Sequence, residues 1–323
     1  MNHPPHGKLP VPTSALLGGV VWGALAAGSL AGRIDLGTIE LLLLLAPLVI
    51  VPLGLELSAR LEIFPQSSSL ERYARHAQFL GAPLAAASFW LLPGGAAASL
   101  ASAWALVCGL LGTCGLLRLF RGGIGSLDAA CGTLALIYLP VGGAWFVASR
   151  AGFSPLGFQE PIVLLTAIHF HYAGFAAPLI ARATSSPLSG SSGAVRRIFR
   201  LVAVGVLACP GLLAAGFIIG PRIKLAAALL LAVSQVGLAI CVLAALGTVQ
   251  RWLAKTLLAF SAGSAVFAMV LAGIWAVGEY PLQPFVNLPQ MARLHGIANG
   301  FGFVLCGLLG WSVVAAASLG DKQ

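Results

Sequence analysis

Charged side chains are scarce in this chain of 323 residues. They make up 8% of it, whereas a soluble globular domain carries roughly 25%. Hydrophobic residues account for 59%, and the mean hydropathy is +0.97. So few charges cannot cover a water-facing surface, and the long unbroken apolar runs differ from the short alternating segments of a membrane β-barrel. The sequence therefore predicts an all-α, polytopic transmembrane helical bundle.

Motifs that hold metals or cofactors are also missing. The six cysteines lie within apolar runs and none forms a C-x-x-C pair, which argues against a structural zinc site and a disulfide framework. No nucleotide-binding loop, haem motif or dense histidine box occurs, so no cofactor is expected. The net charge of +9 does not indicate a nucleic-acid partner, because the basic residues fall in loops between apolar segments.

Apolar segments of about 20 residues, long enough to cross a bilayer, occur ten times. They are 14–32, 36–58, 77–93, 95–117, 127–149, 161–182, 198–219, 223–247, 253–278 and 293–317. A Ser/Gly-rich linker, 184–197, divides six spans in 1–183 from four in 198–318. We expect them to form a single membrane domain over 1–323.

The loops carry an asymmetric charge. If the N-terminus is cytoplasmic, 13 of the 18 Lys and Arg residues fall on the cytoplasmic side. This bias, together with an even number of spans, predicts that both termini are cytoplasmic. The charged segment 59–76 between spans two and three predicts a helix lying at the membrane interface.

Polar residues interrupt the sixth span in the stretch TAIHFHYAGF, residues 166–175. Residues three apart share a helix face, as His169 and Tyr172 do, whereas His171 lies about 200° from His169. On a regular helix this H-x-H pair cannot bind one metal ion, so no metal site is expected. Ionisable residues inside a membrane are otherwise functional candidates.

The last span begins with a second polar group at a similar depth. His295 and Asn299 are four residues apart and share a face, beside a ridge formed by Gly296 and Gly300. Histidine can exchange a proton near neutral pH, and tyrosine and asparagine can orient a substrate or stabilise charge. The candidate catalytic residues are His169, His171, Tyr172, His295 and Asn299.

Further polar and aromatic residues are candidates for substrate binding. Glu40 lies about one turn into an apolar span, and Tyr138 and Gln235 lie at mid-depth in theirs. Trp90 and Trp145 complete this set, although anchoring at the membrane surface also explains them.

Four stretches resemble the YndJ-like bacterial membrane proteins. They are LTAIHFHYAGFAAPLIA, YLPVGGAWFVASRAGFSPLGF, MARLHGIANGFGFVLCGLLGW and, less distinctively, LAPLVIVPLGLEL. The resemblance implies a multi-pass protein of a bacterial membrane, for which we expect the cytoplasmic (inner) membrane. The HFHYAGF and HG-x-x-N-x-x-GF elements are the signature of the family, so its signature coincides with the two polar groups.

Three functions are compatible with these residues. The first is a membrane-embedded enzyme that applies acid–base chemistry to a lipophilic small molecule, by isomerisation, cyclisation or epoxide opening. The second is a transporter or binding protein for a small molecule, with the same residues as its site. The third is a structural protein in which polar side chains only lock the helices together. The first is favoured, with membrane lipids and a lipophilic substrate as the expected partners.

Overall fold

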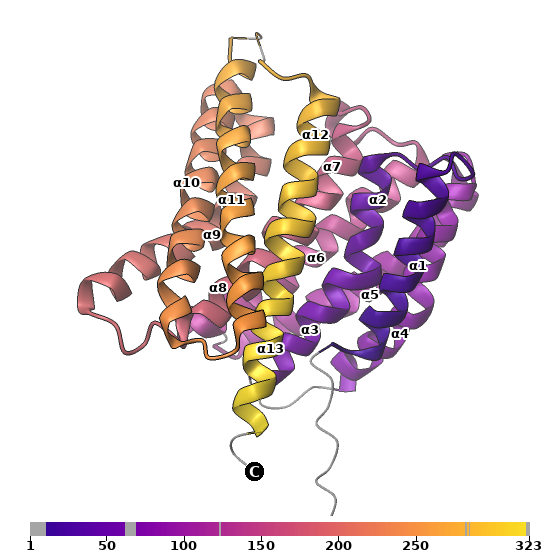
Figure 1. Ribbon diagram of the computed structural model, residues 1–323. Helices are drawn as coiled ribbons and strands as arrows, with labels where there is room; N and C mark the ends of the chain where they lie inside the picture. The colour runs from indigo at the N-terminus through magenta and orange to yellow at the C-terminus, as the bar shows by residue number, and fades with distance from the viewer. Residues whose placement is uncertain (1–10, 62–68, 123, 282, 284, 321–323) are drawn as a thin grey trace, which may run out of the picture.

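The computed structural model describes residues 11–61, 69–122, 124–281, 283 and 285–320, and all regular structure within them is helical (Figure 1). Helices satisfy every backbone polar group internally, which a bilayer demands. The elements are α1 Thr13–Leu30, α2 Thr38–Leu45, η1 Ala46–Ile50, α3 Val51–Arg60, α4 Ser69–Ala87, η2 Ser88–Trp90, α5 Gly95–Phe120, α6 Leu127–Ala151, η3 Pro155–Gly157, α7 Ile162–His169, η4 Phe170–Ala176, α8 Ala177–Ser185, α9 Gly193–Ile219, α10 Pro221–Ala245, η5 Leu246–Thr248, α11 Trp252–Glu279, α12 Leu288–Ile297, η6 Ala298–Leu305 and α13 Cys306–Gly320.

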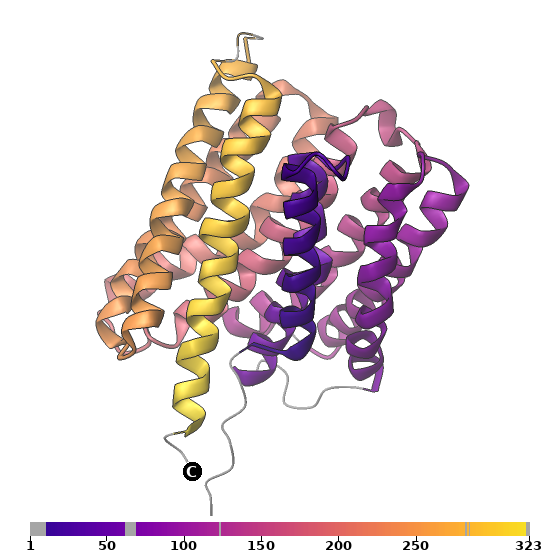
Figure 2. The same cartoon turned by 45° about the vertical axis from the view of Figure 1, so that its right-hand side comes forward.

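Nine helices of the described chain are long and apolar enough to cross a membrane, and each coincides with a predicted span. The remaining predicted span, 77–93, falls in α4, which begins earlier and carries Glu71, Arg72 and Arg75 in its first two turns. The start of α1 and the end of α13 lie at the same end of the bundle (Figure 2). The number of crossings is therefore even, so α4 crosses the bundle as well.

Two predicted boundaries differ from the structure. In the segment 59–76, residues 62–68 lie outside the described part, but from Ser69 onward the chain is already α4. Glu71 is 1% exposed and pairs with Arg118 of α5, so one face of this portion packs against the bundle, whereas Arg72, Tyr73 and His76 stay exposed on the other. The predicted linker 184–197 is shorter than expected, because α8 ends at Ser185 and α9 begins at Gly193.

Three central spans each contain a π-helical segment: η1 between α2 and α3, η4 between α7 and α8, and η6 between α12 and α13. Pro52 and Pro178 follow the first two segments and lack the N–H that would bond to the carbonyls of Leu48 and Gly174. The third segment contains two glycines instead. The segment η4 contacts both η1 and η6. Wide turns of this kind are frequent at functional sites.

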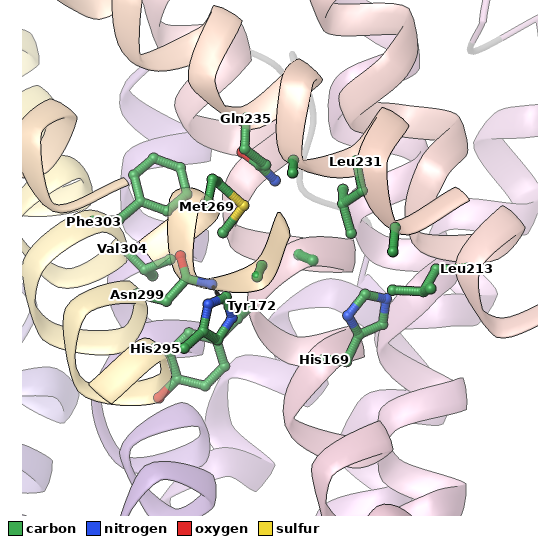
Figure 3. A pocket seen from close by; sticks show the side chains of 14 residues that line it. His169, Tyr172, Leu213, Leu231, Gln235, Met269, His295, Asn299, Phe303 and Val304 are labelled. Atoms are coloured by element: carbon green, nitrogen blue, oxygen red, sulfur yellow. Dashed lines mark hydrogen bonds between the residues drawn. The ribbon is translucent and has the colours of Figure 1, made fainter. Parts of the chain in front are cut away.

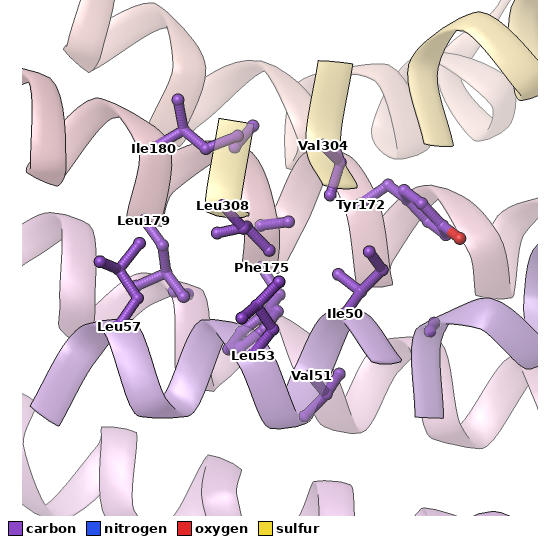
Figure 4. Close-up of a cluster of buried hydrophobic side chains, with 14 of the residues drawn as sticks. Ile50, Val51, Leu53, Leu57, Tyr172, Phe175, Leu179, Ile180, Val304 and Leu308 are labelled. Carbon is purple, nitrogen blue, oxygen red and sulfur yellow. The ribbon is translucent and has the colours of Figure 1, made fainter. Parts of the chain in front are cut away.

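A cluster of buried hydrophobic side chains lies where these three spans meet (Figure 4). Phe175 of η4 is fully buried, and Leu53 of α3 and Leu308 of α13 lie around it. Gly54 makes room for the ring, since a Cβ there would lie 2.7 Å from Cε1 of Phe175. Apolar side chains therefore pack tightly in the middle of the bundle. This packed region lies toward the end of the bundle where α1 begins and α13 ends.

Two glycines of α5 provide a direct test of the helix packing. A Cβ at Gly112 would collide with the ring of Pro140 in α6, whereas a Cβ at Gly109 would meet no atom within 4 Å. We expect Gly112→Ala to lower the free energy of unfolding by about 1–3 kcal/mol through overpacking. Gly109→Ala should be neutral or stabilising by up to about 1 kcal/mol. Thermal unfolding in detergent measures both, and equal midpoints would contradict this α5–α6 interface.

Candidate functional site

The two predicted polar groups meet across a cavity of about 110 Å³ (Figure 3). His169 and Tyr172 line it from α7 and η4, and His295 and Asn299 line it from α12 and η6. Helices α9, α10 and α11 supply the remaining walls, which are apolar except for Gln235. Residues from the two sequence signatures, more than 120 positions apart, thus share one site.

His169 stands on the wall nearest α9. Its Nε2 lies 3.3 Å from the backbone carbonyl of Pro210. A carbonyl can only accept a hydrogen bond, so Nε2 carries the proton and donates it. In the neutral ring Nδ1 is then an acceptor, and no described residue donates to it. Figure 3 shows the ring turned toward His295 across the cavity.

His295 is held in the opposite tautomer. Its Nδ1 donates to the carbonyl of Ala268 in α11 at 2.9 Å, which leaves Nε2 as the acceptor. Asn299 lies one turn further along, and its Nδ2 donates to that nitrogen at 3.4 Å. The amide oxygen Oδ1 of Asn299 is buried and has no hydrogen-bond partner among the described residues.

Tyr172 and Gln235 complete the polar lining of the cavity. Tyr172 is 4% exposed, and its hydroxyl donates to the carbonyl of Leu42 in α2, at 2.8 Å. Gln235 is 3% exposed, and its Oε1 is buried without a partner in the described part of the chain. The hydroxyl of Tyr172 therefore ties the wall to a neighbouring helix, whereas Gln235 keeps an unused acceptor.

His171 lies outside the cavity. It is fully buried on the other side of its helix, where Trp104 of α5 donates to Nε2 at 3.0 Å and Nδ1 donates to the carbonyl of Ala167 at 2.8 Å. Both ring nitrogens are satisfied, and Gly142 of α6 packs against the ring. The helical spacing predicted that His171 and His169 lie on different sides of their helix. The structure has them so, although the helix is locally π-helical.

The other candidate residues are dispersed over the bundle. Tyr138 donates its hydroxyl to the carbonyl of Leu207, and its ring packs on Phe170. Trp145 packs against Phe158, and Trp90 is 57% exposed. Neither these residues nor Glu40 is among those that line the central cavity.

Glu40 sits at the mouth of a different cavity. The helix α2 begins at Thr38, so Glu40 occupies its first turn, where the helix dipole favours a carboxylate, and not a position one turn into the span. With Arg293 of α12 it lines a cavity of about 490 Å³ at the end of the bundle remote from the termini.

The two sites are joined by an intermediate cavity of about 200 Å³. It shares Ala292 with the cavity at the bundle end, and it shares His169, Tyr172, Ala173, His295 and Asn299 with the central cavity. Val304 lines the central cavity and also belongs to the packed core beyond it. The three hollows therefore lie one after another between one end of the bundle and its middle, where the central cavity adjoins that core.

The site contains no charged side chain. The residues that line the central and intermediate cavities include no Asp, Glu, Lys or Arg. Over the whole described part of the chain, no group of three His, Cys, Asp or Glu residues is arranged to hold a metal ion. The cavity is thus a neutral hydrogen-bonding site within an apolar surround.

Several elements of the site carry no signal in the sequence. Backbone carbonyls of Pro210, Ala268 and Leu42 determine which atoms of His169, His295 and Tyr172 carry or give protons. Which carbonyl faces which ring depends on helix packing. Of these elements, only the π-helical segments η4 and η6 have a recognisable sequence signal. Both are rich in glycine and aromatic residues, FHYAGFA and ANGFGFVL.

Comparison with known proteins finds similarity over the part of the chain that contains these residues. A family model described as YndJ-like protein matches residues 41–303, which include His169, Tyr172, Gln235, His295 and Asn299. A curated relative, "Uncharacterized membrane protein YndJ" from Bacillus subtilis (strain 168), is 28% identical over 201 residues, or 61% of this chain and 35% of the relative. The chain thus spans about a third of that relative's length, and no solved structure matches it. The extent of the family match shows that this integral membrane protein belongs to the YndJ-like family.

Proposed function

We propose that this protein is a membrane-embedded enzyme that moves a proton on a lipophilic small molecule held in the central cavity. One observation carries the proposal: the N–H of His169 is bonded to the Pro210 carbonyl, while its Nδ1 lone pair faces the cavity without a donor from the described residues. A histidine so oriented can act as a general base. Its apolar surround suits a lipophilic substrate.

The chemistry that fits is one that needs no co-reactant. In an isomerisation, Nδ1 of His169 takes a proton from one atom of the substrate and returns it to another, so the ring ends the cycle neutral. The Pro210 carbonyl stabilises the intermediate imidazolium, because the Nε2–H bond to it strengthens when the ring is charged. His295 and Asn299 lie on the facing wall, where they can orient the reacting group.

A binding or transport protein is the alternative function for the same residues. Transport requires the site to reach both sides of the membrane in turn. The observed hollows lead to one end of the bundle, and Phe175, Leu53 and Leu308 pack the core beyond Val304. This one-sided access fits an enzyme, a receptor or one state of a transporter, and the metabolite profile described below decides between them.

The proposal places both termini in the cytoplasm and the protein in the bacterial cytoplasmic membrane. The distribution of Lys and Arg supports it, since 13 of the 18 would lie on the cytoplasmic side. Substrate would then enter from the outer end of α2 and α12. Cysteine-accessibility labelling at positions 33 and 222 tests this: labelling from the cytoplasmic side alone would contradict the orientation.

Lipid and metabolite profiling tests the enzyme proposal. Cells that lack the gene should accumulate a lipophilic substrate that cells with the wild-type gene convert. His295→Ala should lower conversion about tenfold or more, because it removes the partner of Asn299 and reshapes the facing wall. His76→Ala, which alters an exposed histidine of α4 remote from the cavity, is the control and should convert normally. If deletion of the gene changes no lipid or metabolite, the enzyme proposal is wrong.

A further inference from the structure

Four donors of the polar cluster are already in use. The N–H of His169 goes to Pro210, the N–H of His295 goes to Ala268, and the hydroxyl of Tyr172 goes to Leu42, all of them backbone carbonyls. The amide N–H of Asn299 goes to His295. Three of these side chains thus direct a proton at a backbone carbonyl and Asn299 directs one at His295, which leaves the second N–H of Asn299 and the NH₂ group of Gln235 as donors.

Three unused groups of the cluster are acceptors. Nδ1 of His169 has a free lone pair, and the buried Oδ1 of Asn299 and Oε1 of Gln235 have no partner among the described residues. A buried acceptor without a donor costs about 1–3 kcal/mol relative to a satisfied one. Three such acceptors around one cavity indicate that the molecule bound there supplies a hydrogen-bond donor.

We propose that the central cavity takes a neutral lipophilic molecule with a hydrogen-bond-donating hydroxyl group, which is directed at Nδ1 of His169 and the amide oxygens of Asn299 and Gln235. The proposal rests on the proposed function of the same cavity and names its substrate class. A neutral donor fits better than an ammonium group, because no carboxylate lines the cavity and an unpaired charge in an apolar site is costly. A carboxylate or a phosphate is likewise disfavoured, because no Lys or Arg lines the cavity to balance its charge.

Photolabelling of membrane vesicles that contain the protein tests the preference. The probes are a decanol that carries a diazirine and its methyl ether, which differ only in the hydroxyl proton. The alcohol should label peptides that line the cavity about fivefold more than the ether does, as one hydrogen bond predicts. Because both probes partition into the bilayer, mass spectrometry of the labelled peptides isolates the contribution of the donor.

Two buried glutamines supply a matched pair of variants. Gln235→Met removes one acceptor at constant volume and should reduce the preference for the alcohol about two- to fivefold. Gln78→Met is the control, since Gln78 is also buried with an unpartnered Oε1 but lines a separate cavity between α1, α3 and α4. It should leave the preference unchanged.

The outcomes separate this inference from the enzyme proposal. Equal labelling of the wild-type cavity by alcohol and ether overturns the inference, and so does a preference that disappears in Gln78→Met but not in Gln235→Met. A preference in the wild-type protein stands even if Gln235→Met does not fold. Labelling requires no turnover, so an alcohol preference combined with an unchanged metabolite profile would reject the enzyme and keep the ligand class.

Discussion

Replacement of His169 by alanine is expected to lower conversion of the substrate by about a hundred- to ten-thousand-fold, the usual contribution of a general base. His169 alone presents a free ring nitrogen to the cavity, since Nε2 of His295 already accepts from Asn299 and both nitrogens of His171 are bonded. The fold should persist, because the substitution removes one hydrogen bond to the Pro210 carbonyl and opens space in an existing cavity. Lipid and metabolite profiling of complemented cells measures the loss.

Chemical rescue distinguishes a base from a packing residue. Imidazole added to membranes that contain His169→Ala can occupy the vacated space and should restore part of the conversion. It should have no effect on the wild-type protein or on His76→Ala, whose altered side chain is exposed on α4. Normal conversion by His169→Ala would remove the basis for the proposed chemistry.

The second large effect is expected on stability, at Glu71. This carboxylate is 1% exposed; its Oε1 lies 3.0 Å from Arg75 on the same helix and its Oε2 lies 2.8 Å from Arg118 of α5. Arg75 also donates to the carbonyl of Leu55 in α3, so the group ties three helices together. Glu71→Gln removes the carboxylate that lies between two partly buried guanidinium groups. We expect it to lower the free energy of unfolding by about 3 kcal/mol.

An ion pair whose carboxylate is more exposed than that of Glu71 is the control. Lys224 and Glu279 lie 2.9 Å apart, with side chains that are 23% and 31% exposed. Glu279→Gln should change the free energy of unfolding by less than about 1 kcal/mol, as exposed ion pairs usually contribute. Unfolding in detergent, compared for the two variants and the wild type, measures the difference. If Glu71→Gln unfolds at the wild-type midpoint, the carboxylate does not hold α4 to its neighbours.

Composition and helical periodicity were sufficient to predict the bundle and the similar depth of the two polar groups. Apolar runs of bilayer length identify the spans without any knowledge of their partners. The depth of His169 and His295 along their spans, and the faces on which they lie, follow from residue spacing. That His169 and Tyr172 face His295 and Asn299 depends in addition on which helices are neighbours, and this is seen only in the structure.

Features that depend on contacts between distant helices were not predictable. The charges of residues 69–76 are typical of an interfacial helix. Only the structure shows that Glu71 pairs with Arg118, which lies 47 positions later in the chain. His171 belongs to the same motif as His169, yet Trp104 of another helix satisfies it and excludes it from the cavity. Glu40 seemed one turn inside a span because the first residue of α2 cannot be located from hydropathy alone.

The carbonyl of Ala268 has an effect that reaches beyond His295. By accepting the Nδ1 proton it makes Nε2 an acceptor, and this in turn makes Asn299 present its NH₂ group to the ring and its oxygen away from it. A proton placed on Nε2 would reverse this order: the ring would donate, and the amide of Asn299 would have to turn over to accept. The oxygen and nitrogen of Asn299 would then exchange places, so the wall that recognised a donor would offer one. A single proton delivered to the facing histidine could in this way release a bound hydroxyl compound, without any movement of a helix.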